Sequence, residues 1–285
     1  MHRLIGELEL DQWIRLEETQ STNDYLMNSA LPAGTIVTAR KQSRGRGRSG
    51  RIWRQSPQQG LYFSGLFGWE ERPPGTTFSL AMALGLLDAL QSSFPDGVAS
   101  LALKWPNDLV RLKGQLQTGS RVTMRKSPAN PEIQESDADS KIASNARTGS
   151  QLEKLGGILI EGKSAPGMWQ TVVGIGLNWS GAPNEESGDA YPPGFLFSNE
   201  TAEKPGQQPE DLVPALCAAL NQRAQHYEQS SIIEDFQKWD VLQNRRIRID
   251  NEARLVTGLD REGALVLEDG HRISDSARNL EILWS

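Results

Sequence analysis

Residues 42–53, with the sequence QSRGRGRSGRIW, contain four arginines, three glycines and one tryptophan. The arginines occur within eight residues that include no acidic residue, so their charges repel one another unless an anion lies among them. A guanidinium group stays charged in proteins and can bond two phosphate oxygens at once, while glycines allow backbone N–H groups to converge on an anion. The segment therefore predicts a loop that binds a small molecule carrying a phosphate.

Three other interpretations of this segment are weaker. Residues 45–50, GRGRSG, fit the G-x-G-x-x-G pattern of dinucleotide-binding folds, but Pro57 and Gly60 follow where a helix would have to form. A nucleic-acid-binding arginine arm is disfavoured because the protein carries a net charge of −6. A solvated loop without a function is common for charged segments, but it leaves the mutual repulsion of the arginines unexplained.

The composition limits the classes of protein to which the chain can belong. At 285 residues, the chain is long enough for one large and one small domain. Its one cysteine, Cys217, excludes an intrachain disulfide and a cysteine-based zinc site, as is typical of a reducing compartment. Acidic residues interrupt residues 1–13, where a signal peptide needs an apolar run, and no apolar run approaches the ~20 residues of a membrane span. We therefore expect a soluble cytoplasmic protein. Its net charge of −6 argues against a surface that serves nucleic acid or an anionic membrane, so we expect neither DNA nor a membrane as a partner.

The pattern of apolar residues predicts regular elements on both sides of the arginine segment. A strand over 35–40 leads into it and a second strand over 60–67 follows, so the arginines lie at a strand end. The segments 154–162 and 171–179 are rich in β-branched residues and are predicted to be adjacent strands. Helices are predicted over 77–90, 211–228 and 231–240, and a short strand before Pro106.

Two changes of composition divide the chain. Residues 113–151 are mostly polar and cannot bury enough apolar surface to offset the ~1–2 kcal/mol per residue that backbone ordering costs, so we expect a mobile insert. From Arg245 onward, short alternating strands with frequent turn residues predict a small β-barrel. We therefore predict one domain over 1–240, which contains the insert, and a second domain over 241–285.

Five segments occur in an order that resembles a known family: STN from Ser21, QSRGRGRSGRIW, KWPNDLV, KLGGILIEG and VVGIGLNW. Together they resemble the catalytic domain of the biotin protein ligases, also called biotin–[acetyl-CoA-carboxylase] ligases, from about Ser21 to Asn178. The resemblance implies an α+β fold, with helices and a mixed β-sheet in the catalytic domain and an SH3-like β-barrel at the C-terminus. Some members carry an N-terminal winged-helix domain that makes them repressors of the biotin operon. Because STN begins at residue 21, we expect the monofunctional type without this DNA-binding domain.

The resemblance also implies a reaction, its cofactors and its partner. The biotin carboxylate attacks the α-phosphate of ATP to give biotinyl-5'-AMP and pyrophosphate, and a carrier-protein lysine then attacks this mixed anhydride. Mg²⁺ would assist, because the first step brings two anions together. The carrier would be the biotin carboxyl carrier protein of acetyl-CoA carboxylase, and the sequence leaves open whether the enzyme is a homodimer. Lipoate–protein ligases, which share the adenylate chemistry, are the nearest alternative, and a nucleic-acid-binding module is a more distant one.

The matching motifs assign roles to individual residues. By this resemblance Arg46 and Arg48 close over the biotin carboxylate and the adenylate phosphate, and Gly47 lets the backbone approach. Lys154 bonds the reacting carboxylate and then the acyl phosphate, while Gly157 leaves the backbone bare where the biotin rings bind. The predicted catalytic residues are therefore Lys154, Arg48, Arg46 and Asp108.

Biotin is a neutral bicyclic urea on an apolar tail, so its site needs aimed hydrogen bonds more than charge. The family match supplies these bonds from four polar side chains: Ser21, Thr22, Asn23 and Gln42. Ser21 or Thr22 could also cap the helix that follows, and both roles are compatible because side chains at a helix start converge on one point.

The nucleotide is assigned, by the same resemblance, to Arg48, Arg51, Trp53, Lys104, Asn107 and Asn178. Trp53 would form part of the adenine wall or, in a structural role, pack the base of the loop onto the sheet. Asp108 would orient Mg²⁺ or help to deprotonate the incoming lysine, and as an Asp after Pro106 it also fits an ordinary turn. The polar loop over 180–197 would close over the adenine.

Overall fold

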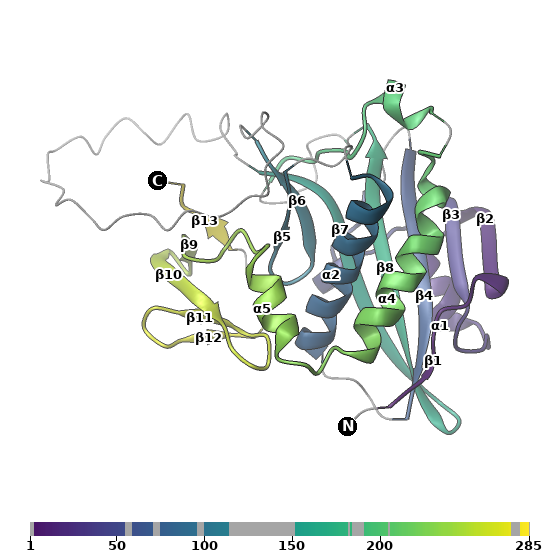
Figure 1. Ribbon diagram of the computed structural model, residues 1–285, viewed down its shortest axis with the longest axis horizontal. Helices are drawn as coiled ribbons and strands as arrows, with labels where there is room; N and C mark the ends of the chain where they lie inside the picture. The colour runs from purple at the N-terminus through teal and green to yellow at the C-terminus, as the bar shows by residue number, and fades with distance from the viewer. Residues whose placement is uncertain are drawn as a thin grey trace, which may run out of the picture.

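The computed structural model describes residues 3–54, 59–70, 75–95, 100–113, 152–181, 183, 191–204, 206–274 and 280–284 (Figure 1). The polar insert predicted over 113–151 lies outside these residues except for Lys113, and so does part of the loop over 180–197. No helix in the described ranges has both the length and the apolar character that a membrane-spanning segment requires.

An eight-stranded mixed sheet forms the centre of the molecule (Figure 1). Seven strands follow the order β2-β3-β4-β8-β7-β6-β5, and β1 pairs with β4 outside this path. Strands β2 and β3 are parallel, whereas the other pairs of this sheet are antiparallel. The strands are β1 (Leu4–Gly6), β2 (Trp13–Thr19), β3 (Ile36–Gln42), β4 (Gln59–Trp69), β5 (Leu101–Lys104), β6 (Asp108–Leu112), β7 (Leu152–Ala165) and β8 (Met168–Ser180). The predicted mixed α+β fold is confirmed, as is the pairing of the two β-branched segments, which are β7 and β8.

Helix α1 (Thr22–Asn28) connects the parallel strands β2 and β3 and covers one face of the sheet. Ser21 caps this helix, because its side-chain oxygen accepts a hydrogen bond from the backbone N–H of Asp24 at 3.3 Å. The apolar side of the helix packs into a small buried cluster that consists of Leu26, Val37, Leu66 and Val172. The predicted helix cap is therefore confirmed.

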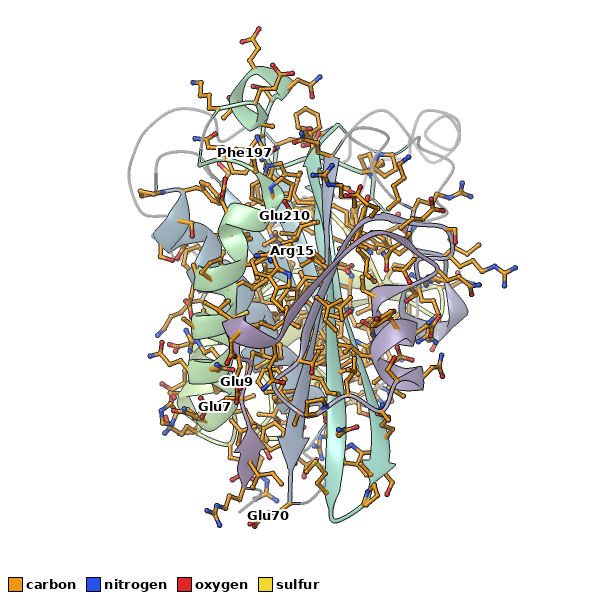
Figure 2. All side chains as sticks on the ribbon, turned by 90° about the vertical axis from the view of Figure 1, so that its right-hand side faces the viewer. Glu7, Glu9, Arg15, Glu70, Phe197 and Glu210 are labelled. Carbon is orange, nitrogen blue, oxygen red and sulfur yellow. The ribbon has the colours of Figure 1, made fainter. Side chains whose placement is uncertain are left out.

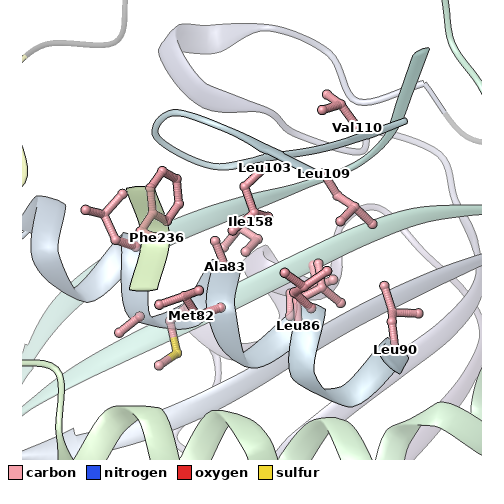
Figure 3. Close-up of a cluster of buried hydrophobic side chains, with 14 of the residues drawn as sticks. Met82, Ala83, Leu86, Leu90, Leu103, Leu109, Val110, Ile158 and Phe236 are labelled. Atoms are coloured by element: carbon pink, nitrogen blue, oxygen red, sulfur yellow. The ribbon is translucent and has the colours of Figure 1, made fainter. Parts of the chain in front are cut away.

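Helices α2 (Gly75–Ser93), α4 (Val213–Gln225) and α5 (Ser231–Gln237) cover the opposite face. Figure 2 shows α4 and α1 on the two sides of the sheet. Helix α2 contacts α4 as well as β6 and β7, which explains why its sequence is apolar on almost every side. In Figure 3, Leu86 and Leu90 of this helix lie beside Leu103, Leu109 and Ile158 of the sheet, within one buried cluster. The shorter helices are η1 (Leu10–Gln12), η2 (Arg48–Gly50), α3 (Asn199–Ala202) and η3 (Pro209–Leu212).

The last strands form a separate antiparallel sheet in the order β12-β11-β10-β9-β13. They are β9 (Arg246–Ile249), β10 (Glu252–Leu259), β11 (Leu265–Leu267), β12 (Arg272–Ile273) and β13 (Glu281–Ile282). Within the described part of the chain the edge strands β12 and β13 do not pair, so this sheet is open. The closed β-barrel that the sequence predicts is therefore not observed, because each edge strand contains two residues and neither meets the other.

The C-terminal sheet attaches to the central sheet at the turn between β5 and β6. Nε1 of Trp105 donates a hydrogen bond to the backbone oxygen of Gly263 at 2.9 Å. Asp240 accepts hydrogen bonds at 3.1 Å from the backbone N–H groups of Trp105 and Leu242. Asp240 is 1% exposed, and among the described residues its other carboxylate oxygen has no hydrogen-bond partner. Burial raises the pKa of this carboxyl group to about 6.

We expect Asp240 to make the stability of the protein fall as the pH rises from about 4 to about 6. Because its folded-state pKa is raised, the folded protein binds this proton more tightly than the unfolded chain does. A rise from the ordinary value of 3.8 to about 6 corresponds to a loss of about 3 kcal/mol in the free energy of unfolding. Urea denaturation at several pH values would measure this loss. Asp240→Asn, which cannot titrate, should lack it, and an equal fall in both proteins would contradict the assignment.

Candidate functional site

A pocket opens on the face of the sheet that carries α1. Its wall combines the start of this helix, the arginine segment 42–53, the β5–β6 turn and the strands β7 and β8. The predicted site residues that line it are Ser21, Thr22, Asn23, Gln42, Arg46, Gly47, Arg48, Arg51, Trp53, Lys104, Asn107, Asp108, Lys154 and Gly157. The fold therefore brings together motifs that lie far apart in the sequence, and only Asn178 of the predicted set is missing from the wall.

The side chains assigned to biotin form a hydrogen-bonded group at the start of α1. The backbone N–H of Thr22 donates to Oε1 of Gln42 at 2.8 Å, and its hydroxyl lies 3.2 Å from the same oxygen. The hydroxyl of Ser64, on β4, lies 2.8 Å from that of Thr22 and 2.6 Å from Oδ1 of Asn23. Thr22 and Asn23 are each 3% exposed. These contacts hold polar groups in fixed directions, as recognition of a neutral polar ring requires.

The arginine segment folds into a short hairpin beside the pocket. Two backbone hydrogen bonds, at 2.8 and 2.9 Å, pair residues 45–47 with residues 51–53. Arg48, at the tip of this hairpin, donates from Nη1 to the side-chain oxygen of Asn107 at 3.4 Å. Asn107 in turn donates from Nδ2 to the backbone oxygen of Ile158 at 2.6 Å, so β7 fixes the partner of Arg48.

Lys154 and Lys104 add two ammonium groups to the pocket. Nζ of Lys154 lies 3.1 Å from Oδ1 of Asp108, and the two side chains are 17% and 21% exposed. Lys104 is buried, and its Nζ lies 5.5 Å from the centre of the Tyr191 ring. Burial lowers the pKa of Lys104, while the charges of Asp108 and Asp240 act in the opposite direction. An anion bound beside Lys104 would add to their effect and favour its charged form.

The indole of Trp53 packs against β8 at Gly176. A Cβ atom at Gly176 would lie 2.6 Å from Cε2 of the indole, so the contact requires glycine at this position. Nζ of Lys154 lies 5.7 Å from the centre of a Trp53 ring. Among the described residues, Nε1 of Trp53 is buried without a hydrogen-bond partner. Of the two roles predicted for Trp53, packing onto the sheet is observed, and the adenine contact stays a prediction.

Asn178 lies beneath a neighbouring segment instead of in the pocket wall. Its Nδ2 atom donates to the backbone oxygen of Gly194 at 2.9 Å. The same segment binds the backbone of Lys154, whose N–H donates to Pro192 at 2.9 Å and whose oxygen accepts from Gly194 at 2.8 Å. Asn178 thus holds residues 192–194 beside Lys154. The expected closure of the loop over 180–197 involves residues 184–190, which lie outside the described residues.

The C-terminal part of the chain also reaches the pocket, which the sequence analysis did not foresee. Tyr191 and Leu280 line the wall, and the Tyr191 hydroxyl donates to the backbone oxygen of Leu280 at 3.4 Å. No motif marks either residue. Tyr191 belongs to the loop over 180–197 that was expected to reach the nucleotide, whereas the place of Leu280 depends on how the C-terminal sheet docks, which local sequence patterns do not encode.

Two acidic residues beside the wall were also missed. Asp24 and Glu161 both form ion pairs with Arg46. Glu161 could have been found from the alternation of a strand, because Gly157, Leu159 and Glu161 must share one face of β7. Asp24 follows the STN motif directly on the first turn of α1.

The acidic side chains of the pocket limit which metal ion it could hold. Within the described ranges, no group of three or more His, Cys, Asp or Glu side chains is placed to hold one. Asp108 is the carboxylate in the described pocket wall. Mg²⁺ is usually held by one or two carboxylates together with substrate phosphates and water. The pocket therefore offers one carboxylate, Asp108, to an ion that would arrive with a nucleotide.

Most of the elements that build this pocket lie in a region that matches a known protein family. The model of the biotin/lipoate A/B protein ligase family matches residues 13–178, which is more than half of the chain. The chain belongs to this family. The matched region includes α1, the arginine segment, the β5–β6 turn and most of β8.

Curated relatives in this family match part of the chain. The bifunctional ligase/repressor BirA of Bacillus subtilis is 31% identical over 115 residues, which are 39% of this chain and 33% of that protein. The biotin–[acetyl-CoA-carboxylase] ligase of Paracoccus denitrificans is 31% identical over 177 residues, 59% of this chain and 55% of that protein. The matched part of the chain therefore spans about a third to just over half of the length of these relatives.

Solved structures share the fold over nearly the whole chain. The biotin protein ligase of Aquifex aeolicus in complex with biotin and ATP has a TM-score of 0.64 at 21% identity, and covers 96% of this chain and 100% of that chain. The Leishmania major enzyme in complex with biotinyl-5-AMP has a TM-score of 0.51 at 23% identity, with 96% and 99% covered. At these identities the likeness establishes the fold alone.

Gly174 on β8 offers a test of the close packing beneath the pocket. A Cβ atom there would lie 2.0 Å from Oδ1 of Asn23, whose amide is already bonded to Ser64 and to the backbone of β7. We expect Gly174→Ala to lower the free energy of unfolding, measured by urea denaturation, by about 1–3 kcal/mol, the usual cost of overpacking. Gly75→Ala is the control, because a Cβ atom at Gly75 has no neighbour within 4 Å. Equal changes in the two variants would refute the steric argument.

Proposed function

We propose that the protein is a biotin protein ligase, which uses ATP to activate biotin as biotinyl-5'-AMP and transfers the biotinyl group to a lysine of a carrier protein. The observation that carries the proposal is the division of the pocket into a neutral polar part at α1 and a cationic part around Arg48, Lys104 and Lys154. A ureido ring suits the first part, and a carboxylate beside a nucleotide phosphate suits the second. The Paracoccus relative, named as a biotin ligase, supports the same substrate.

In the first half-reaction, a carboxylate oxygen of biotin attacks the α-phosphorus of ATP, the bond to the bridging oxygen of the β-phosphate breaks, and pyrophosphate leaves. Two anions approach each other in this step, so fixed positive charge lowers its barrier. Arg46, Arg48 and Lys154 supply that charge, and at ~4 Å each cation contributes up to ~4 kcal/mol at an effective dielectric of about 20. Asp108 would hold Mg²⁺ that arrives with ATP, and the ion would neutralise part of the phosphate charge.

In the second half-reaction, the amine of the carrier lysine attacks the acyl carbon, the bond from this carbon to the phosphate oxygen breaks, and AMP leaves. The attacking nitrogen must lose a proton. Among the described residues of the pocket wall, Asp108 is the one that carries a carboxylate. Its Oδ1 atom lies 3.1 Å from Nζ of Lys154. We assign to Asp108 both the orientation of Lys154 and the acceptance of this proton. The biotin carboxyl carrier protein of acetyl-CoA carboxylase is the acceptor that we propose.

We further propose that residues 1–240 form the ligase domain and residues 241–285 a C-terminal SH3-like unit. The separate antiparallel sheet supports this division. The hydrogen bonds of Trp105 to Gly263 and of Tyr191 to Leu280 support a close attachment of the unit to the pocket.

The decisive experiment is to measure pyrophosphate release from ATP in the presence of biotin, of lipoate or of neither. Release that requires biotin is the expected result, since the polar group at α1 is arranged for a ring with several hydrogen-bonding atoms. Release with lipoate instead would identify the other branch of the family. Salt-dependent RNA binding without pyrophosphate release would favour a nucleic-acid-binding module.

Lys154→Ala should slow biotin-dependent pyrophosphate release about a hundred- to a thousand-fold, because removal of one charge-stabilising donor usually costs ~2.7–4 kcal/mol of barrier. The variant should still unfold cooperatively. Lys238→Ala is a matched control, because Lys238 is an exposed lysine that pairs with Asp235 at 2.8 Å outside the pocket. A Lys154→Ala variant that releases pyrophosphate at the wild-type rate would show that this lysine is not catalytic.

A further inference from the structure

Glu161 lies on β7 beside the pocket, and its carboxylate contacts two side chains of the pocket wall. Its Oε2 atom accepts a hydrogen bond from Nδ2 of Asn23 at 2.9 Å and pairs with Nη2 of Arg46. Asp24, on the first turn of α1, pairs with the same Nη2 atom at 2.8 Å. We propose that Glu161, assisted by Asp24, is a positioning residue that orients Arg46 and Asn23 for the carboxylate and the ring of biotin. This inference rests on the proposed function.

The two carboxylates hold Arg46 without using all of its donors. A guanidinium group carries five N–H bonds, of which two are on Nη2. Asp24 and Glu161 both approach Nη2, and the described residues leave Nε and Nη1 without a hydrogen bond or ion pair. Three N–H bonds therefore remain for a ligand carboxylate or phosphate. The ion pairs with Asp24 and Glu161 therefore fix the guanidinium group of Arg46 and still leave it able to bind a ligand.

Glu161 also determines which end of the Asn23 amide faces which neighbour. The two ends of an amide have nearly the same shape, but a carboxylate can only accept hydrogen bonds. Nδ2 of Asn23 therefore points to Glu161 and to the backbone oxygen of Leu159, and Oδ1 points to the hydroxyl of Ser64. The carboxylate of Glu161 thus orients both the neutral amide of Asn23 and the cationic guanidinium group of Arg46.

The ion pairs of Arg46 contribute more to geometry than to stability. The side chain of Arg46 is 40% exposed, that of Asp24 is 35% exposed and that of Glu161 is 23% exposed. Ion pairs with this exposure are screened by water and add little to the free energy of unfolding. They do restrict the long side chain of Arg46 before a ligand arrives, so its rotamer entropy is lost on folding and not on binding. We therefore expect Glu161 to affect ligand affinity far more than stability.

The test compares Glu161→Gln and Asp24→Asn with the wild type, using biotin and its neutral amide as probes and tryptophan fluorescence as the binding signal. Glu161→Gln should weaken biotin binding about tenfold and binding of the amide less than threefold. The amide oxygen of the substituted side chain can still accept a hydrogen bond from Asn23, but it carries no charge to pair with Arg46, and only biotin offers Arg46 a charge. Asp24→Asn should show the same pattern with a smaller change, because Glu161, which contacts both Arg46 and Asn23, stays in place. The KM for ATP should change less than the KM for biotin. Glu281→Gln, which removes an exposed ion pair with Arg248 in the C-terminal sheet, is the control.

Biotin binding by Glu161→Gln that equals or exceeds that of the wild type would overturn the proposal, and so would equal losses for biotin and its amide. Amide hydrogen exchange of residues 45–53 in the ligand-free protein is an independent measurement, and Glu161→Gln should make it faster. This measurement separates the two hypotheses. If the wild type releases no pyrophosphate with biotin, the proposed function fails, whereas unchanged exchange in the variant means that Glu161 does not hold Arg46.

Discussion

The pocket depends on the absence of side chains from the middle of β8 on one face of the sheet. Gly174 and Gly176 leave room there for Asn23 and Trp53, which would clash with any Cβ atom at those positions. Since side chains alternate along a strand, the intervening residues Val173 and Ile175 point to the opposite face and join the main core. Strand β8 therefore forms part of the core on one face and the floor of the pocket on the other.

The side chains around this pocket carry several positive charges. An acidic protein with a net charge of −6 gathers two lysines and several arginines around one pocket, although burying like charges together is unfavourable. Carboxylates offset this repulsion: Asp108 pairs with Lys154, and both Asp24 and Glu161 pair with Arg46. Each carboxylate offsets part of the repulsion among the cations and fixes the direction of one of them.

The parts of the fold that sequence reasoning found are those with strong local signals. The Ser21 cap, the uniformly apolar helix α2 and the β-branched strands β7 and β8 all appear where they were predicted. Strand β2 was missed because it lies at an edge of the sheet, where its seven residues are only partly buried or exposed and show no regular alternation. Strand β6 was missed because it begins directly after the turn at Pro106. The predicted barrel failed because closure depends on the pairing of distant edges, which short alternating segments do not encode.

The amino-acid sequence by itself determined the types of chemical group in the site and the order in which they occur, since motif spacing and side-chain chemistry are local properties. It also predicted that the arginine segment begins at a strand end and that β7 and β8 are neighbours. Only the tertiary structure decided that Glu161 faces Arg46, that Asn178 holds residues 192–194 and that Leu280 closes the wall from the C-terminal sheet. Those positions depend on strand register and on the docking of one sheet against another. Both are set by packing between segments that are distant in the chain.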